Sequence, residues 1–410
     1  MSYFGVHNHT MYSNIRLLDC INRPDKLITT AFEMGLSGIA ITDHECVSAH
    51  MEVNQFMKKF REEHPNFTVA LGNEIYLTFT RDSGQKYYHF LLIAKNARGH
   101  RALRELSTIA WKNSYVDRRM ERVPTLKEEL REVMQKYRGD VIATTACMGG
   151  ELSTNALLMS EAQKVNDTKS AQYFYNEICQ FMEFCLDIFG SDFYIECAPS
   201  TKWDQIAVNQ KLRAIANAYH VPMVVGTDAH YLTEQDREIH KAYLNSKEGE
   251  REVDDFYEFA RLMTPAECKE LLMLSFDDEQ FIDEMFENSL QLQAKIEWYS
   301  LERKQIVPKV EVPKYSAWDI WDRVPGLIMD NFDHRWFTLQ QLVQKGNDQE
   351  RYWVMECLKS LWEKGLQDRQ DYWDRLEIEA DVIKFIGDKL DDCLFAYFNT
   401  FKHYIDLFWE

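Results

Sequence analysis

The first 230 residues alternate between short runs rich in β-branched or aromatic residues and longer amphipathic stretches, and this alternation constrains the possible folds most strongly. Seven of the short runs have the length and composition of β-strands. Because parallel neighbours must be joined by crossover connections, which are usually helices, the alternation predicts a parallel sheet. Both an open doubly wound sheet and a closed barrel fit this pattern. The predicted strands are 3–6, 38–42, 68–71, 87–93, 141–145, 193–196 and 222–226.

Helical stretches separate these strands. The first is predicted from Pro24, a residue type favoured in the first turn, to Gly35, a residue type favoured where a helix stops. The other predicted helices are 48–63, 97–112, 125–137, 169–189 and 203–219.

The character of the sequence changes beyond about residue 250, where strand-like runs give way to acidic, aromatic-rich text typical of helices. The segment 303–315 contains two prolines among alternating apolar residues, which predicts an extended connector. Apolar residues at three- and four-residue spacing predict helices from there to residue 410. We therefore expect a first domain at 1–285, a connector at 286–315 and a helical region at 316–410.

The chain carries 66 acidic and 47 basic residues, a net charge of −19. Attraction to phosphates dominates the non-specific affinity of proteins for nucleic acid, so this charge argues against DNA binding through the protein's own charge alone. Bound cations or a partner subunit would have to supply the attraction. The sequence has no run of about 18 apolar residues, no signal-peptide pattern and no C-x-x-C pair among its nine cysteines. These features predict a soluble cytoplasmic protein.

Polar residues gather where the predicted strands end. In β/α barrels, chemistry is concentrated at the carboxyl ends of the strands. Residues two apart on a strand face the same side, so the first and the last strand could each point a pair of side chains into one cavity. The residues at or near the strand ends are His7, His9, Asp43, His44, Glu74, Cys147, Asp228 and His230, and His89 lies within the fourth strand.

These side chains carry the imidazole, carboxylate and thiolate groups that bind zinc, manganese or iron. A single residue such as His89 would more often be a hydrogen-bonded core histidine. Six separate strands that each offer a ligand type are much harder to obtain by chance. The sequence therefore predicts a metal site at the mouth of the sheet.

Six motifs also resemble, in order, those of the PHP (polymerase and histidinol phosphatase) domain, in the variety found at the start of the bacterial C-family DNA polymerase III alpha subunit. They are "HNHTMYS…LLD", "GIAITDHE", "LGNEIY", "YYHFLLIAKN", "ATTACMGGEL" and "VGTDAHYLTEQDREIH". The resemblance covers roughly residues 1–285. It implies an α/β fold, a distorted seven-stranded β/α barrel that holds two or three divalent metal ions, followed here by a mostly helical C-terminal region.

The resemblance also implies a ligand role for nine residues. A first ion would be held by His7, His9, Glu74 and Asp228, a second by Glu74, His89 and Cys147, and a third by Asp19, His44 and His230. Of these, His9, Glu74 and Asp228 would act in catalysis. Three residues inserted shortly before Asp19, Asn14-Ile15-Arg16, are positioned to displace that aspartate.

Several other residues match no ligand of the family. Cys46 is interpreted as a small buried residue, and Glu196 and Cys197 as core residues or as supports for the ligands. The remaining histidines are expected at the surface or at helix ends: His50, His64, His100, His220, His240, His334 and His403.

The C-terminal region resembles the stretch leading into the palm of the same polymerases, in "VPKVEVP" and "DRLEIEADVIKFIGDKLDDCLFAYFNTFKHYI". The glycine-rich loop and paired catalytic aspartates of that palm are absent from the sequence, so we expect no nucleotidyl transfer by this polypeptide. The chain would then be the front third of a split polymerase or a PHP enzyme that kept the adjoining helices. An unrelated helical cap is the alternative.

Clustered metal ions suit the hydrolysis of phosphoesters. The favoured function is a metal-dependent 3′–5′ exonuclease that acts on single-stranded DNA or 3′ ends and proofreads for a polymerase. A separate polymerase polypeptide is expected to bind through residues 316–410. The alternatives are a small-molecule phosphatase like histidinol phosphatase, and a structural module in which the metals only stabilise the fold.

Overall fold

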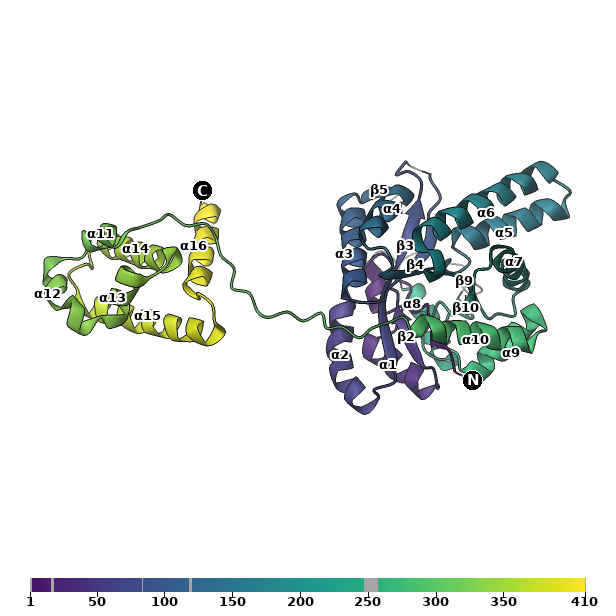
Figure 1. The fold of residues 1–410 in the computed structure, drawn as a ribbon, viewed down its shortest axis with the longest axis horizontal. Coiled ribbons are helices and arrows are strands. Elements are labelled where there is room, and N and C mark those ends of the chain that lie inside the picture. The colour runs from purple at the N-terminus through teal and green to yellow at the C-terminus, as the bar shows by residue number, and fades with distance from the viewer. Residues whose placement is uncertain (1, 16–17, 83, 118–119, 247–256, 410) are drawn as a thin grey trace. The chain divides into compact units, whose positions relative to one another are not determined.

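The computed structural model describes residues 2–15, 18–82, 84–117, 120–246 and 257–409. The chain forms two compact units, Met1–Leu301 and Glu302–Glu410, and each is described by itself (Figure 1). In the described residues, no helix has both the length and the apolar character needed to cross a membrane.

An eight-stranded sheet forms the centre of the first unit, and seven of its strands follow one another around the barrel. Asn8 and Ala229 form a further parallel bridge, so the first and last strands meet and the sheet is a nearly closed barrel. The prediction of a seven-stranded β/α barrel is thereby confirmed. Along the sheet, the strands follow the order β1 (Phe4–Gly5), β2 (Gly38–Ile41), β3 (Thr68–Thr78), β4 (Tyr88–Ala94), β8 (Val141–Thr144), β9 (Phe193–Cys197) and β10 (Met223–Val225).

The expectation of an all-parallel sheet is wrong at β4, which runs antiparallel to both β3 and β8. The cause is the length of β3, which continues to Thr78 and leaves a connection too short for a crossover helix before β4 begins at Tyr88. Glu74 therefore lies inside β3, opposite Leu91 of β4, rather than after the strand.

Helices flank the barrel (Figure 1). Six lie where the sequence predicts them: α1 (Pro24–Glu33), α2 (His50–Glu63), α3 (Ala97–Lys112), α4 (Lys127–Lys136), α6 (Thr168–Phe189) and α7 (Trp203–Tyr219). Other elements were not predicted. They are the hairpin of β5 (Tyr115–Asp117) and β6 (Met120–Arg122), the strand β7 (Pro124–Leu126), and the helices α5 (Glu151–Lys164) and α8 (Arg237–Leu244).

The inside of the barrel is packed with apolar side chains such as Phe4, Ile93 and Val224. Two helices, α9 (Pro265–Phe276) and α10 (Glu279–Gln293), complete the unit, and Leu292 of α10 joins this inner cluster. Because α10 continues past residue 285, the compact unit extends to Leu301.

The second unit begins with an extended segment and continues as helices. Residues 302–316 contain no helix or strand. Trp336 and Trp373 are fully buried in the core of this unit, and their indole N–H groups bond Asp374 and the carbonyl of Gln367. The helices are α11 (Ala317–Trp321), α12 (Gly326–Arg335), α13 (Phe337–Lys345), α14 (Asp348–Glu363), α15 (Gln370–Leu390) and α16 (Phe395–Trp409).

Candidate metal centre

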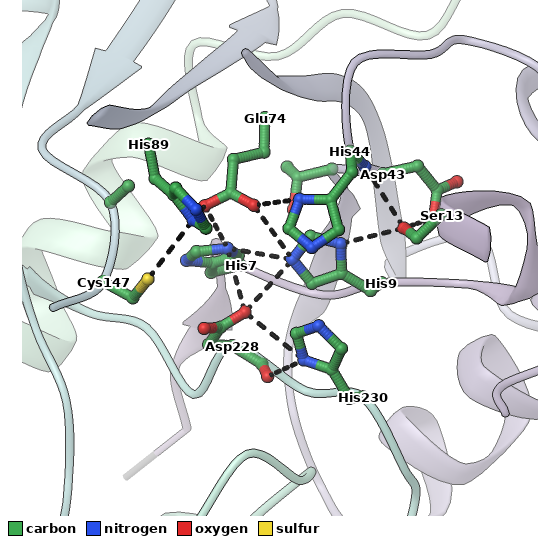
Figure 2. A network of polar contacts seen from close by, with 12 residues as sticks. His7, His9, Ser13, Asp43, His44, Glu74, His89, Cys147, Asp228 and His230 are labelled. Carbon is green, nitrogen blue, oxygen red and sulfur yellow. Dashed lines mark hydrogen bonds and ion pairs between the residues drawn. The ribbon is translucent and has the colours of Figure 1, made fainter. Parts of the chain in front are cut away.

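Polar side chains from widely separated parts of the chain meet at one end of the barrel (Figure 2). The strand ends position them: His7 and His9 follow β1, His44 follows β2, and Asp228 and His230 follow β10. The seam that closes the barrel runs through this site, since the amide of His9 donates to the carbonyl of Ala229 at 3.0 Å. A second bridge, between His44 and Glu74, joins β2 and β3 at the same level.

Four candidate ligand side chains lie close together at the centre. Nε2 of His7 and Nε2 of His9 are 3.1 Å apart, and Oδ1 of Asp228 lies 3.2 Å and 3.1 Å from them. The carboxylate of Glu74 lies 3.2 Å from Nε2 of His7 and 3.5 Å from Nε2 of His9. An ion with bonds of about 2.0–2.1 Å to tetrahedral ligands holds them about 3.3 Å apart. The observed spacing therefore fits a small divalent ion.

The other predicted ligands surround Glu74. Nδ1 of His44 lies 2.6 Å and Nδ1 of His89 lies 3.0 Å from its two oxygens. The thiol of Cys147 is 3.7 Å from Nδ1 of His89, so these side chains form a second group. His9, His44 and His230 form a third group whose ligand atoms all lie within 4.8 Å of one another.

Asp19 reaches the site from a loop. Its Oδ2 is 3.5 Å from Nε2 of His44. The inserted Asn14 does not displace the loop but fixes it, because the amides of Asp19 and Cys20 both donate to its side-chain oxygen. The structure thus brings all nine predicted ligands to one site; of the inserted residues, Arg16 lies outside the part that is described.

A buried carboxylate orients His7 from behind. Nδ1 of His7 lies 2.7 Å from Oε1 of Glu196, while the hydroxyl of Thr144 donates to the other oxygen of Glu196. A carboxylate can only accept here, so Nδ1 of His7 is the donor, and in the neutral ring Nε2 presents a lone pair to the centre. Of the two roles that the sequence allowed, core residue or support for a ligand, Glu196 has the second. Cys197 lies in the core.

A similar chain of contacts orients His9. The hydroxyl of Ser13 donates to Asp43 at 2.8 Å and lies 3.0 Å from Nδ1 of His9. The single hydroxyl hydrogen of Ser13 is donated in the hydrogen bond to Asp43, so Ser13 can only accept from His9. Nδ1 of His9 is therefore the donor, and Nε2 of the neutral ring offers a lone pair to the centre. Asp43, predicted at a strand end, thus acts behind the ligands. Ser13 has no distinctive sequence signal of its own.

The electrostatic balance of the site favours a bound cation. Burial lowers the pKa of His7, but the carboxylates of Glu196 and Asp228 outweigh it and raise this pKa well above the ordinary value. Burial raises the pKa of Glu74 and of Asp228, but the surrounding imidazoles outweigh it and lower both. The two central carboxylates are therefore ionised and attract positive charge.

The pKa values of Cys147 and His9 shift in opposite directions. Burial, with the nearby Asp228, raises the pKa of the Cys147 thiol well above its usual range. Burial, with the neighbouring His44 and His230, lowers the pKa of His9 well below its usual value. The thiol is therefore protonated unless a cation binds it, and His9 is a neutral ligand.

Buried polar atoms without partners provide a test of the metal hypothesis. Among the described residues, Nε2 of His230, Oε2 of Glu74 and Oδ1 of Asp228 are buried and make no hydrogen bond of good geometry, although imidazole nitrogens lie close to both carboxylate oxygens. Buried acceptors are rarely left unsatisfied, because removing them from water is costly. Three acceptors in one site fit divalent cations bound by nitrogen and oxygen.

The backbone around the centre is strained. Asp228 has φ 47° and Ala146, which precedes Cys147, has φ 59°. Left-handed φ values at residues with a Cβ are uncommon and tend to cluster at functional sites. Close packing adds a constraint behind the ligands, since a Cβ on Gly226 would lie 2.1 Å from Oε1 of Glu196.

Comparison with known proteins agrees with this geometry, since residues 5–200 match the PHP domain family. This segment is a PHP domain. Asp228 and His230 lie beyond the matched span but join its ligands at the barrel seam. The resemblance seen in the sequence is confirmed, both for the PHP domain and for the polymerase relatives.

The relatives of this chain include DNA polymerases. A DNA-directed DNA polymerase of Bacillus phage SPbeta is 35% identical over 425 residues, which is 99% of this chain and 32% of the polymerase. The DNA polymerase III alpha subunit of Aquifex aeolicus is 26% identical over 94% of this chain and 30% of its own length. The chain thus spans about a third of the length of these relatives. A solved structure from Bifidobacterium adolescentis covers 67% of this chain and 97% of its own length, with a TM-score of 0.33 and 14% identity.

The sequence interpretation was wrong for three histidines. His50, His100 and His240 are buried rather than exposed or capping. His50 lies 3.0 Å from His100, and Nε2 of His240 lies 2.7 Å from the carbonyl of Asp19. His64 and His220 do end α2 and α7, as expected. Only the fold reveals the buried roles, because the partners lie far away in sequence.

Proposed function

We propose that the nine residues at the barrel mouth hold two or three divalent metal ions, with manganese, zinc and iron as the candidates. Metal ions bound there would neutralise phosphate charge and lower the pKa of water at a site of phosphoester hydrolysis. The ligands are His7, His9, Asp19, His44, Glu74, His89, Cys147, Asp228 and His230. The observation that supports this proposal is the convergence, in a PHP domain, of buried acceptor atoms that make no hydrogen bond of good geometry.

The residues of the chain would prepare this chemistry in three ways. Ionised Glu74 and Asp228 concentrate negative charge at the centre, where cations bind. Glu196 holds His7, and Ser13 holds His9, each with a ligand nitrogen turned inward. Preorganised ligands need little rearrangement during reaction, so the site can act on a phosphoester as soon as it is loaded.

The substrate proposed is DNA, at single-stranded or 3′ ends, and the activity a 3′–5′ exonuclease that proofreads for a polymerase. Similarity to a DNA-directed DNA polymerase over 99% of this chain supports a nucleic-acid substrate over a small-molecule phosphate such as histidinol phosphate. A protein of net charge −19 also needs bound cations to hold DNA phosphates beside it.

Hydrolysis of 3′-labelled single-stranded DNA, measured beside a panel of phosphomonoesters, tests the proposal. His9→Ala and Asp228→Asn should remove the activity and leave the thermal midpoint within a few degrees of the wild-type value. His64→Ala, at the end of α2, is the matched control and should keep the activity. Cleavage of phosphomonoesters alone would favour the small-molecule phosphatase. If the two variants had a much lower thermal midpoint and the wild type showed no hydrolysis, the structural module would be favoured.

We also propose that a polymerase polypeptide packs against α15 and α16. Aromatic side chains on these helices are exposed, including Phe385 at 57%, Phe401 at 60% and Tyr404 at 65%. Large exposed apolar surfaces commonly mark interaction sites. Co-purification with and without residues 316–410 is the test; equal recovery of a polymerase with both forms, or with neither, would contradict the proposal.

A further inference from the structure

A pocket of about 260 Å³ lies beside the candidate metal centre. It is formed by β3, the start of β4 and the segment from β6 to β7. The side chains that line it are Tyr76, Tyr87, His89, Met120, Arg122, Val123 and Pro124. Its volume is below the roughly 300–1,000 Å³ of sites for drug-sized ligands, so it suits one small planar group.

The pocket and the metal centre share a wall. His89 lines the pocket, and its Nδ1 lies 3.0 Å from Oε1 of Glu74 in the centre. Tyr76 also joins them: its ring centroid is 4.8 Å from that of His89 and 5.6 Å from that of His44. A ligand in the pocket would therefore be adjacent to a phosphate held at the centre.

Part of the pocket wall is aromatic. Tyr76 sits opposite His89 on β4 and alongside Pro124 on β7, which fixes its place in the sheet. Tyr87 is tied to the β5–β6 hairpin by a contact between its hydroxyl and that of Tyr115. Two tyrosine rings held by separate elements offer faces on which a flat heteroaromatic group can stack.

Arg122 gives the pocket a hydrogen-bond donor. Its guanidinium carbon lies 5.5 Å from the ring centroid of Tyr87. Within the part of the chain that the structure describes, Nε of Arg122 is buried and has no hydrogen-bond partner. The surrounding protein shields this Nε, so the part of Arg122 that lines the pocket and could donate to a ligand is the end of its guanidinium. Nucleobases carry carbonyl oxygens and ring nitrogens that accept such bonds.

We propose that this pocket binds one nucleobase, that of the nucleotide whose phosphate lies at the metal centre. The base stacks on Tyr76 and Tyr87, and the guanidinium of Arg122 donates to an acceptor on its edge. The inference rests on the proposed action on DNA and adds a base-binding subsite to it. Stacking explains how a strongly acidic chain gains affinity for a strand end without a broad basic surface.

The other pocket at the centre is less suited to a base. It has a volume of about 110 Å³, and Cys147 and Asp228 are among the residues that line it. Among the described residues that line it, Phe259 is the one aromatic side chain, and the ammonium of Lys202 pairs with Glu258 at 2.7 Å. We therefore assign the base to the pocket beside His89.

Equilibrium binding of two fluorescein-labelled oligothymidylates tests the assignment. One ends in thymidine and the other in an abasic nucleotide, and a phosphorothioate at the last linkage slows hydrolysis. Fluorescence anisotropy with manganese present gives each Kd. The wild type should bind the thymidine end about tenfold more tightly, within the range measured for one stacked base. Equal Kd values, or no binding of either probe, would overturn the inference.

Variants locate the effect in the pocket. Tyr87→Ala should bring the ratio of the two Kd values close to one, and Arg122→Ala should lower it several-fold. Tyr87→Phe keeps the ring and should keep the ratio. Lys86 is an exposed cation over Tyr88, outside the pocket. Lys86→Ala should therefore weaken the binding of both probes equally. A Tyr87→Ala protein of wild-type metal content and thermal midpoint that keeps the full ratio would overturn the assignment.

Hydrolysis of the same oligonucleotides without phosphorothioate separates the two proposals. Base-dependent binding without hydrolysis would refute the exonuclease and retain the base pocket. Hydrolysis with a Kd ratio of one would refute the pocket and retain the exonuclease.

Discussion

Nδ1 of His7 lies 2.7 Å from Oε1 of Glu196, and both side chains are fully buried. The contact fixes the ring of His7 from the side away from the metal centre. Its other nitrogen is thereby turned toward His9, Glu74 and Asp228. A carboxylate behind a histidine ligand commonly raises metal affinity and sets the tautomer.

Replacing Glu196 by glutamine should therefore lower the affinity for manganese or zinc about 10- to 100-fold. The glutamine amide has no negative charge to favour donation by His7. Its N–H groups would also face the hydroxyl of Thr144, which donates to Glu196 in the wild type. Titration of metal-free protein, with circular dichroism to check folding, measures the change. Glu151→Gln, which breaks a buried ion pair with Lys127, is the matched control and should leave metal affinity unchanged. Equal affinities in wild type and Glu196→Gln would contradict the support role.

Cys147 should act as a thiolate ligand when metal is bound. Its pKa is raised by burial, so only a cation would deprotonate it near neutral pH. Protein loaded with cobalt(II) should show a near-ultraviolet sulfur-to-metal band that Cys147→Ser lacks. Cys46→Ser should keep the band, because that thiol is buried and contacts the carbonyl of Tyr12 instead. A band that survives Cys147→Ser would exclude this thiol as a ligand.

Gly226→Ala should destabilise the barrel and loosen metal binding together. The new Cβ would lie 2.1 Å from Oε1 of Glu196, so the carboxylate behind His7 must move. Overpacking of this kind costs about 1–3 kcal/mol of unfolding free energy. Denaturant unfolding and metal titration measure both effects. Gly326→Ala, where a Cβ meets nothing within 4 Å, is the control; if the two variants behaved alike, the close approach at Gly226 would be unimportant.

The buried pair of His50 and His100 should make the barrel less stable in mild acid. Burial, with the nearby His100, lowers the pKa of His50 to about 3. Its Nε2 donates to the carbonyl of Gly72, so Nδ1 accepts from His100 and the ring of His50 is neutral. Above a pH of about 6.5 the unfolded His50 is neutral too, and folding releases no proton.

As the pH falls below about 6.5, the unfolded His50 binds a proton that the folded protein excludes. Unfolding free energy is then lost at up to about 1.4 kcal/mol per pH unit until His50 titrates in the folded state. Denaturant unfolding of metal-free protein between pH 7 and 5 should show a smaller loss in His50→Gln than in wild type. His220→Asn, at an exposed helix end, should keep the wild-type slope. Identical slopes in wild type and His50→Gln would refute this account.

The sequence predicted most of the barrel and the ligand set because both are encoded locally. Each strand has its own apolar run, and His7, His9, Asp228 and His230 occur in motifs at strand ends. The antiparallel β4 was missed because strand direction depends on how far β3 extends, which its pattern does not fix.

The supporting residues were harder to predict because their roles depend on partners distant in sequence. Glu196 contacts His7 across 189 positions, and His240 contacts Asp19 across 221. The β5–β6 hairpin beside the pocket is also too short to leave a strong alternating pattern.

The barrel seam ties the metal centre to the order in which the chain is made. Asn22 donates to the carbonyls of both His9 and Ala229, which lie at opposite ends of the barrel sequence. Closing so long a loop carries an entropy cost that no local contact repays. During synthesis, the centre can therefore assemble only after Asp228 and His230 have left the ribosome. Metal uptake would then mark the moment at which a nascent chain has completed its barrel.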